Sequence, residues 1–269
     1  IKKGGLPNFN DSSKDICPDI DEVKEFAISY LNNQENKLFG IRRLLSKAKK
    51  DSFSIAQNSK FLDMEVPKIV DLKYTGWTFI RPQEEWELVF KSGPSCPKHL
   101  PAHAHSDLLS FDLFRNGYPI ISETGTSIYG ECSKRYFERS GAAHNVLRLA
   151  KPKSVFNNSL TWTEPVDVWG NFRAGRKAKT LKKLVKQINN NTFSISCSHN
   201  GYKSINAKYT REIKLIVYKD DSLEILISDQ MNCKYSLIGN LLLHFGPNQE
   251  KENFKIETKP SKLIKNIKH

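Results

Sequence analysis

The sequence predicts a mainly β protein, an antiparallel β-sandwich (a supersandwich) with a short helical segment before it. From about Val66 onward, short β-branched and aromatic runs are separated by Gly, Pro, Asn and Asp, with almost no helical periodicity between them. The chain has 269 residues, 38% of them hydrophobic, which is long enough for a full sandwich and one appended unit. We therefore expect two parts, residues 1–65 and residues 66–269.

The first part contains two predicted helices. Val23, Phe26 and Tyr30 recur at helical spacing, and a second helix is expected from Leu38 to Leu45. Two helices of this size cannot bury their apolar faces alone, so we expect them to pack on the sandwich or on further polypeptide. Because the first residue is not Met, we also expect the natural N-terminus, with any signal peptide, to lie before it.

The second part reads as strands joined by tight turns. The strongest turn signal is Asn116-Gly117, since a type I′ hairpin needs positive φ at both central residues. A second hairpin is expected at "VYKDDSLEIL", residues 217–226. The other strand-like runs cover residues 76–82, 86–93, 108–122, 144–149, 193–202, 209–231 and 236–247.

The charge and the cysteines narrow the classes of function. Lys and Arg total 42 against 29 Asp and Glu, a net charge of +13 that should attract anions such as nucleic acid, acidic lipid or acidic polysaccharide. No RNA-binding signature or helix-turn-helix pattern accompanies the charge, so nucleic acid is not expected as a partner. No apolar run approaches the ~20 residues that span a bilayer. Five cysteines without a CxxC pair argue against a zinc ribbon and against a dense disulfide framework.

The stretch "LPAHAHSDLLSF" carries the strongest chemical signal. His103, His105 and Asp107 alternate, so in an extended segment all three would project from one face, as suits a metal site or a proton-transfer pair. The alternative is two histidines that merely line a surface strand. Glu123 and His144 could complete a site, because imidazole and carboxylate are ligands that zinc accepts.

The predicted hairpin does not by itself bring these residues together. A two-residue turn at Asn116-Gly117 places Glu123 opposite Ser110, roughly 16 Å from His105 along a straight strand. A bend or loop before Leu108 is therefore required, and residues 93–101 are loop-like enough to permit one.

Three motifs in order give a more specific signal. "LPAHAHSDLLSFDLFRNGYPIISETGTSIYG", "RYFERSGAAHNVLRL" and "VWGNFRAGRKA" resemble the heparinase II/III-like family of polysaccharide lyases, with a weaker match at "LLLHFGP". The dense part of the resemblance covers residues 93–178. It implies an (α/α) toroid before the sandwich, with residues 1–65 as the end of that toroid.

The resemblance also implies roles for particular residues. His103 matches an active-site histidine near the scissile bond, and His105, Glu123 and His144 match metal ligands. We expect a structural Zn²⁺ that holds His103 in place, although Glu123 stands where the family usually has Asp or a small polar residue. Asp107 is expected to hydrogen-bond and orient an imidazole ligand rather than to bind the metal itself.

The implied reaction is β-elimination in an acidic, uronic-acid-containing polysaccharide, such as a glycosaminoglycan, alginate or a bacterial surface polymer. In related enzymes the catalytic Tyr and Asn come largely from the toroid, so the 269 residues alone are expected to be nearly inactive. Tyr129, Tyr136 and Arg139 are our candidates for substrate contacts. A guanidinium forks well onto a carboxylate, whereas the two tyrosines could equally serve strand packing.

Two other functions stay open at this point. One is a non-catalytic carbohydrate-binding or envelope polysaccharide assembly protein with the same fold. The other is a basic nucleic-acid-binding β-domain, which steep salt-dependent DNA binding would reveal. The family resemblance implies a periplasmic, cell-envelope or secreted location.

Overall fold

The computed structural model describes residue 9, residues 67–96, 101–151, 161–170, 172–233 and 236–247, and residue 257. The two helices expected within residues 1–65 lie outside the described residues. Phe9 is buried against the first sheet, where its ring centroid lies 4.7 Å from that of Trp77.

The first sheet is a five-stranded antiparallel meander. Its third strand is buried along its whole length, as expected for strand residues such as Leu88 and Phe90 with neighbours on both sides. The predicted type I′ turn is confirmed, because φ is 51° at Asn116 and 80° at Gly117. The strands are β1 (Ile69–Leu72), β2 (Trp77–Ile80), β3 (Trp86–Lys91), β4 (Phe111–Arg115) and β5 (Tyr118–Ile121).

The second sheet is a four-stranded antiparallel meander with longer strands. In its third strand, buried residues alternate with partly exposed ones, so that Ile213 and Leu215 face inward. The hairpin predicted at residues 217–226 is confirmed, since Val217 pairs with Leu223 across the turn. The strands are β10 (Thr180–Asn189), β11 (Thr192–His199), β12 (Lys208–Val217) and β13 (Leu223–Asn232).

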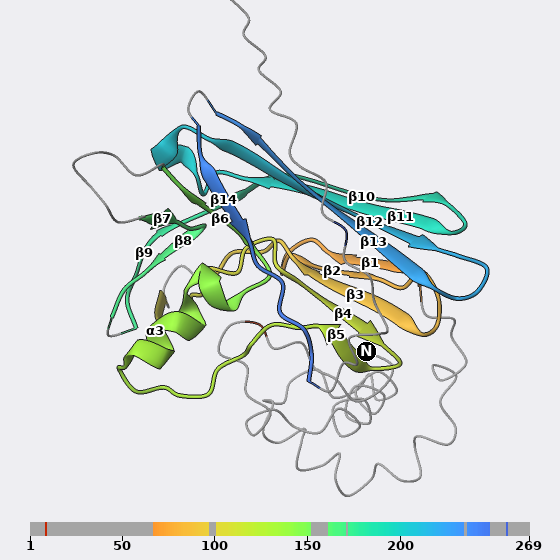
Figure 1. Ribbon diagram of the computed structural model, residues 1–269, viewed down its shortest axis with the longest axis horizontal. Helices are drawn as coiled ribbons and strands as arrows, with labels where there is room; N and C mark the ends of the chain where they lie inside the picture. The colour runs from red at the N-terminus through yellow and green to blue at the C-terminus, as the bar shows by residue number, and fades with distance from the viewer. Residues whose placement is uncertain are drawn as a thin grey trace, which may run out of the picture.

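Smaller elements lie at one end of these two sheets (Figure 1). A three-stranded sheet joins β14 (Ile238–Leu241), β6 (Leu147–Ala150) and β7 (Trp162–Thr163), and β8 (Val166–Val168) pairs with β9 (Ala174–Lys177). The described helices are α3 (Ser133–Arg139) and the 3-10 helices η2 (Pro101–His103), η3 (Gly141–Ala143) and η4 (Lys203–Ile205). In the part of the chain described, no helix is long and apolar enough to cross a membrane.

One apolar core lies between the two large sheets. It joins Leu88 and Phe111 of the first sheet to Phe193, Ile195 and Ile213 of the second, all fully buried. Burying each such side chain stabilises the fold by about 1.5–3 kcal/mol. Figure 1 shows β10–β13 laid over β1–β5, so the predicted β-sandwich is confirmed.

Candidate functional site

The segment from residue 101 to residue 110, named here the histidine loop, is not extended. η2 ends at His103, whose side chain is exposed, whereas His105 and Asp107 have no exposed surface. The 3-10 turn and a following turn, in which Ser110 N donates to Asp107 O at 3.0 Å, break the alternation. The expectation that the three side chains share one face is therefore wrong.

The bend required by the hairpin register lies in this loop. Leu109 has a φ of 67°, which is rare for a bulky residue and costs about 1–3 kcal/mol. Its N–H donates to Lys91 O and its carbonyl accepts from Arg211 Nη1, each at 2.9 Å. Bonds on both sides of the strained residue keep the bend in place.

The simple two-residue hairpin register does not hold beyond Phe114, because an irregularity pairs Leu113 with Ile121. The side chain of Glu123 nevertheless contacts Ser110 and belongs to a buried network. Its Oε1 accepts from Ser110 Oγ and, at 3.0 Å, from Asn145 N. Its Oε2 contacts Nδ1 of His144. Its own N–H donates to Asp112 Oδ1 at 2.8 Å. Both carboxylate oxygens of Glu123 are thus occupied by groups of the protein.

The bend also brings the two buried histidines together. The ring centroids of His105 and His144 lie 5.3 Å apart, with the planes tilted by 55°. Beside them, the buried Lys91 ammonium pairs with Asp107 Oδ2. Residues from β3, the histidine loop and the segment before β6 therefore meet in one buried cluster.

The charges of this cluster shift two pKa values in opposite directions. Burial alone would raise the pKa of Asp107, but Lys91, His144 and His105 outweigh it and hold that pKa below its ordinary value. Burial opposes protonation of His144, yet Glu123 beside it raises the pKa of the imidazole. These neighbours favour the ionised carboxylate of Asp107 and the protonated imidazole of His144.

Two buried atoms of this cluster are of the kind that zinc binds. His144 Nε2 and Asp107 Oδ1 are buried and make no hydrogen bond, and both are atoms that zinc accepts. Glu123 binds the other nitrogen of His144, which is how a carboxylate orients a ligating imidazole. Both oxygens of Glu123, which the family resemblance matches to a metal ligand, are already bonded within the protein. Across the described segments, no three His, Cys, Asp or Glu side chains are already arranged to hold a metal.

Arg139 is buried and bonded within the protein. Its buried guanidinium donates to the carbonyls of Ala104 at 3.1 Å, Trp169 at 2.9 Å and Arg173 at 3.0 Å. Its own carbonyl accepts from Ser106 N at 2.9 Å. These donors fix the histidine loop, while Arg139 also lines a small hollow with Tyr129 and Trp169, so a contact between Arg139 and substrate stays a prediction.

Both candidate tyrosines lie at the surface. Tyr129 is 39% exposed, and its ring stacks on Phe172 with centroids 6.4 Å apart. Tyr136 is 50% exposed, and its hydroxyl donates to Val168 O at 2.8 Å. The rings of both residues remain accessible, whereas the hydroxyl of Tyr136 is used within the protein.

Comparisons with known proteins agree with this fold. The family model described as "Heparinase II/III-like, C-terminal" matches residues 64–265. The chain belongs to the heparinase II/III-like family. A search of curated proteins finds no match.

Solved structures are similar to this heparinase II/III-like chain at low sequence identity, and a heparinase III structure shares its fold. A heparinase III gene product aligns with a TM-score of 0.52 and 17% identity over 84% of this chain and 29% of its own. The heparan sulfate lyase HepC from Pedobacter heparinus aligns with a TM-score of 0.41 and 15% identity over 87% of this chain and 43% of its own. The chain thus spans less than a third of the first of these structures.

Sequence reasoning missed the residues that hold the heparinase-like site together. Asn145 follows the family histidine His144, and its side chain bonds Phe111 O at 2.9 Å and His244 N at 2.7 Å. Arg211 of β12 donates from one nitrogen to Leu109 O and, at 2.6 Å, to Asn145 O. A signal for Arg211 was present, since it occupies an inward-facing position of a strand that is otherwise apolar on that face.

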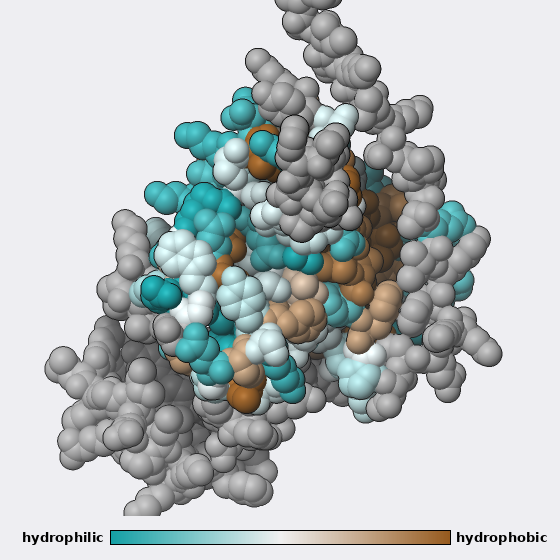
Figure 2. Space-filling model, turned by 60° about the vertical axis from the view of Figure 1, so that its left-hand side comes forward, coloured by the Kyte–Doolittle hydropathy of each residue, from teal (hydrophilic) through white to brown (hydrophobic). Residues whose placement is uncertain are grey.

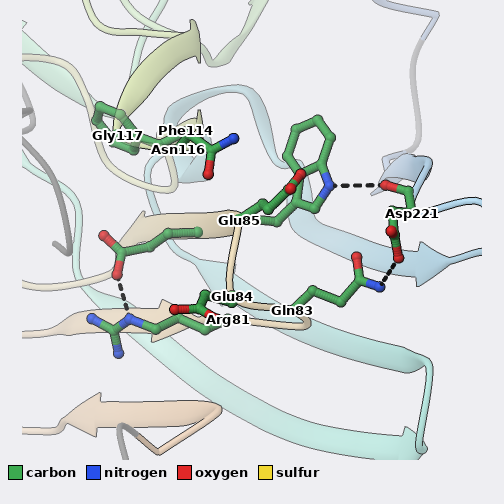
Figure 3. Close-up of a pocket in the computed structure, with 10 residues that line it drawn as sticks. Arg81, Gln83, Glu84, Glu85, Phe114, Asn116, Gly117 and Asp221 are labelled. Atoms are coloured by element: carbon green, nitrogen blue, oxygen red, sulfur yellow. Dashed lines mark hydrogen bonds and ion pairs between the residues drawn. The ribbon is translucent and has the colours of Figure 1, made fainter.

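The larger described cavity of this heparinase-like sandwich is elsewhere. It has a volume of about 450 Å³ and lies among the turns after β2, β4 and β12 (Figure 3). Gln83 Nε2 donates to Asp221 Oδ1 at 2.8 Å on its wall, and Arg81 pairs with Glu87 at 2.5 Å. The histidine loop lies at the opposite end of β4, roughly 15 Å away along the strand. None of the predicted site residues lines this cavity.

Proposed function

We propose that this chain is the sandwich part of a polysaccharide lyase that cleaves a uronic-acid-containing polysaccharide by β-elimination. The observation that carries the proposal is the contrast within the histidine loop. His103 is exposed, while residues 104–110 behind it are buried and bonded to Lys91, Arg139 and Arg211. An exposed imidazole on a rigid, buried loop is suited to proton transfer with a bound polymer.

The reaction sets clear demands on the residues. A base takes the proton from C5 of the uronate, its electron pair forms the C4–C5 double bond, and the C4–O4 bond breaks as O4 gains a proton. We assign His103 to one of these proton transfers, because imidazole exchanges protons near neutral pH. The net charge of +13 supports attraction of the anionic chain. Periplasm, envelope or extracellular space is where such a polymer would be met.

We also propose that a structural Zn²⁺ is held by His105 and His144, with Asp107 as the carboxylate and Glu123 behind His144. The two buried atoms without hydrogen bonds, His144 Nε2 and Asp107 Oδ1, support this assignment. When bound, the ion would tie the histidine loop to the segment before β6. His105→Ala should therefore lower zinc content and melting temperature together. Unchanged zinc content in that variant would contradict the assignment.

The deciding experiment follows ultraviolet absorbance of the unsaturated uronate product. The full-length gene product that carries these residues is incubated with heparan sulfate, hyaluronan, alginate and polyglucuronate. We expect absorbance to rise on at least one polymer and the rise to be lost in His103→Ala. Tyr74→Ala, at a fully exposed position in the β1–β2 turn, is the matched control and should keep the activity.

Two results would overturn the lyase proposal. One is no elimination on any polymer by a folded full-length product. The other is an undiminished rate in His103→Ala. A folded protein that binds these polymers without cleaving them would instead be a carbohydrate-binding or assembly protein.

A further inference from the structure

A group of exposed and half-buried aromatic side chains lies beside the histidine loop, on the side formed by α3 and the β8–β9 hairpin. We name the group the aromatic platform. Figure 2 turns this side toward the viewer, and residues of intermediate hydropathy, drawn pale, gather there between teal ones. Trp169 and Tyr136 are each 50% exposed. The members are Tyr129, Tyr136, Trp169 and Phe172, which line one small hollow together with Arg135 and Arg139.

The indole of Trp169 is fixed in position and half of it is exposed to solvent. The backbone N–H of Trp169 donates to the backbone carbonyl of Arg173 at 2.9 Å, and this bond closes the turn between β8 and β9. The indole packs directly on Gly175 of β9, where any Cβ would overlap the ring atom Cζ2. Only glycine lets the ring lie against the strand, so one face of the indole is supported while the remainder is open to solvent.

The opposite wall of the hollow is also fixed. Phe172 has a φ of 56°, which is unusual for an aromatic residue and costs about 1–3 kcal/mol. The ring of Phe172 stacks on Tyr129 with the planes only 23° apart. The Arg135 guanidinium carbon lies 5.3 Å from the Tyr129 centroid and 5.5 Å from that of Phe172. A strained backbone and a buried cation thus hold two rings that core packing does not require.

The aromatic platform and His103 share one support. Arg139 donates to Trp169 O and Arg173 O on the platform side and to Ala104 O in the histidine loop. Ala104 is the residue directly after His103. A single buried guanidinium therefore sets the position of the indole relative to the proposed active-site histidine.

We propose that the aromatic platform binds one sugar ring of the acidic polysaccharide, with Trp169 as the stacking surface, in a subsite next to the one at His103. This inference rests on the proposed function and adds a subsite to it. The C–H face of a pyranose packs well on an electron-rich indole, whose rigidity keeps the entropy cost of binding low. The exposed Arg173 at the rim complements a carboxylate or sulfate on that sugar.

The test measures binding without turnover. Heparan sulfate and hyaluronan oligosaccharides are titrated into the full-length gene product carrying His103→Ala, and binding is followed by calorimetry. Adding Trp169→Ala should raise the Kd about ten-fold, and Trp169→Phe should restore part of the affinity. Gly175→Val keeps the indole but lifts it from β9, so it should weaken binding as well. Tyr118→Ala, 71% exposed on the β4–β5 turn, is the control and should leave the Kd unchanged.

The outcomes separate this proposal from the lyase proposal. If elimination is observed but Trp169→Ala binds as tightly as its parent with an unchanged melting temperature, the platform proposal fails alone. If no elimination is found yet binding depends on Trp169, the platform stands and the lyase proposal fails. If the folded protein binds neither oligosaccharide, the platform proposal fails, and the lyase proposal is decided separately by the absorbance experiment on the four polymers.

Discussion

His199 shows how strongly its surroundings determine a histidine in this sandwich. It is fully buried at the end of β11, where Tyr202 and Tyr209 place their ring centroids 5.1 and 4.9 Å from its own. Its Nδ1 accepts from Gly201 N at 2.9 Å, so the neutral ring carries its proton on Nε2. Burial, together with the nearby charges of Arg211 and Arg176, lowers the pKa of His199 to about 3.

This lowered pKa predicts a pH-dependent loss of stability. In the unfolded chain the pKa of His199 is about 6.5. Between about pH 6.5 and 3 this histidine is therefore protonated in the unfolded state and neutral in the folded state. Stability contributed by His199 is therefore present above pH 6.5 and lost as the pH falls. From about pH 7.5 to 5, the wild type should lose about 2 kcal/mol more unfolding free energy than His199→Gln.

Urea unfolding at the two pH values measures this difference. His103→Gln, at an exposed histidine, serves as the control and should lose stability with pH as the wild type does. Parallel pH dependence in the wild type and His199→Gln would contradict the prediction.

The charge of Lys91 should affect how tightly the proposed site binds zinc. The Lys91 ammonium and a zinc ion would compete for Asp107, so removing the ammonium should raise zinc affinity. Without metal, Lys91→Met leaves Asp107 buried without its cation, which costs about 3–5 kcal/mol. We expect the melting temperature of the variant to fall after chelation and to recover with zinc.

Calorimetric titration with zinc and thermal melts before and after a chelator test this expectation. Lys182→Met, at an exposed position of β10, is the control and should change neither property. If zinc raises the melting temperature of neither the wild type nor Lys91→Met, the zinc proposal is wrong.

At the scale of elements, β12 is bonded to the candidate site through Arg211. Besides Leu109 O and Asn145 O, the guanidinium binds Asp229 of β13 through Nε at 2.8 Å and Nη2 at 2.9 Å. Arg211→Met should destabilise the fold by about 3–5 kcal/mol, because the largely buried Asp229 carboxylate loses its cation and two carbonyls lose a donor. Adding Asp229→Leu should recover part of that loss.

Urea unfolding of the single and double variants gives these values. Lys208→Met, at an exposed position of the same strand, should stay within about 0.5 kcal/mol of the wild type. A loss below about 1 kcal/mol for Arg211→Met would show that the charged network is not needed for stability.

The β4–β5 hairpin offers a second test at this scale. Gly117 has a φ of 80°, so a Cβ there is strained, and Gly117→Ala should cost about 1–2 kcal/mol. Gly130→Ala is the matched control, since the nearest atom to a Cβ at Gly130 is 3.9 Å away. Equal unfolding free energies for the two variants would contradict the importance of the type I′ turn.

For the whole molecule, the net charge of +13 should govern how tightly an anionic polymer is held. Salt screens such attraction, so raising NaCl from about 0.05 to 0.5 M should weaken heparan sulfate binding about ten-fold. Stacking on Trp169 is less sensitive to salt, so the loss in Trp169→Ala should persist at both concentrations. Titration calorimetry at the two salt concentrations measures both effects, and salt-independent binding would contradict the electrostatic part.

Local chemistry made much of this molecule predictable from its sequence. Alternating side chains give sandwich strands such as β12, and positive φ at Asn116 and Gly117 gives the hairpin, because both depend on neighbouring residues alone. The ordered motifs likewise indicated the family and brought out His103, His105 and His144.

Only the tertiary structure decided which groups meet in the buried site. The 3-10 turn that ends at His103 leaves that side chain exposed while His105 is buried, and Glu123 rather than Asp107 contacts Nδ1 of His144. Arg139, expected to contact substrate, donates hydrogen bonds to three backbone carbonyls. A buried polar group must find its partners among whatever the folded chain brings near, and those partners come from segments far apart in the sequence.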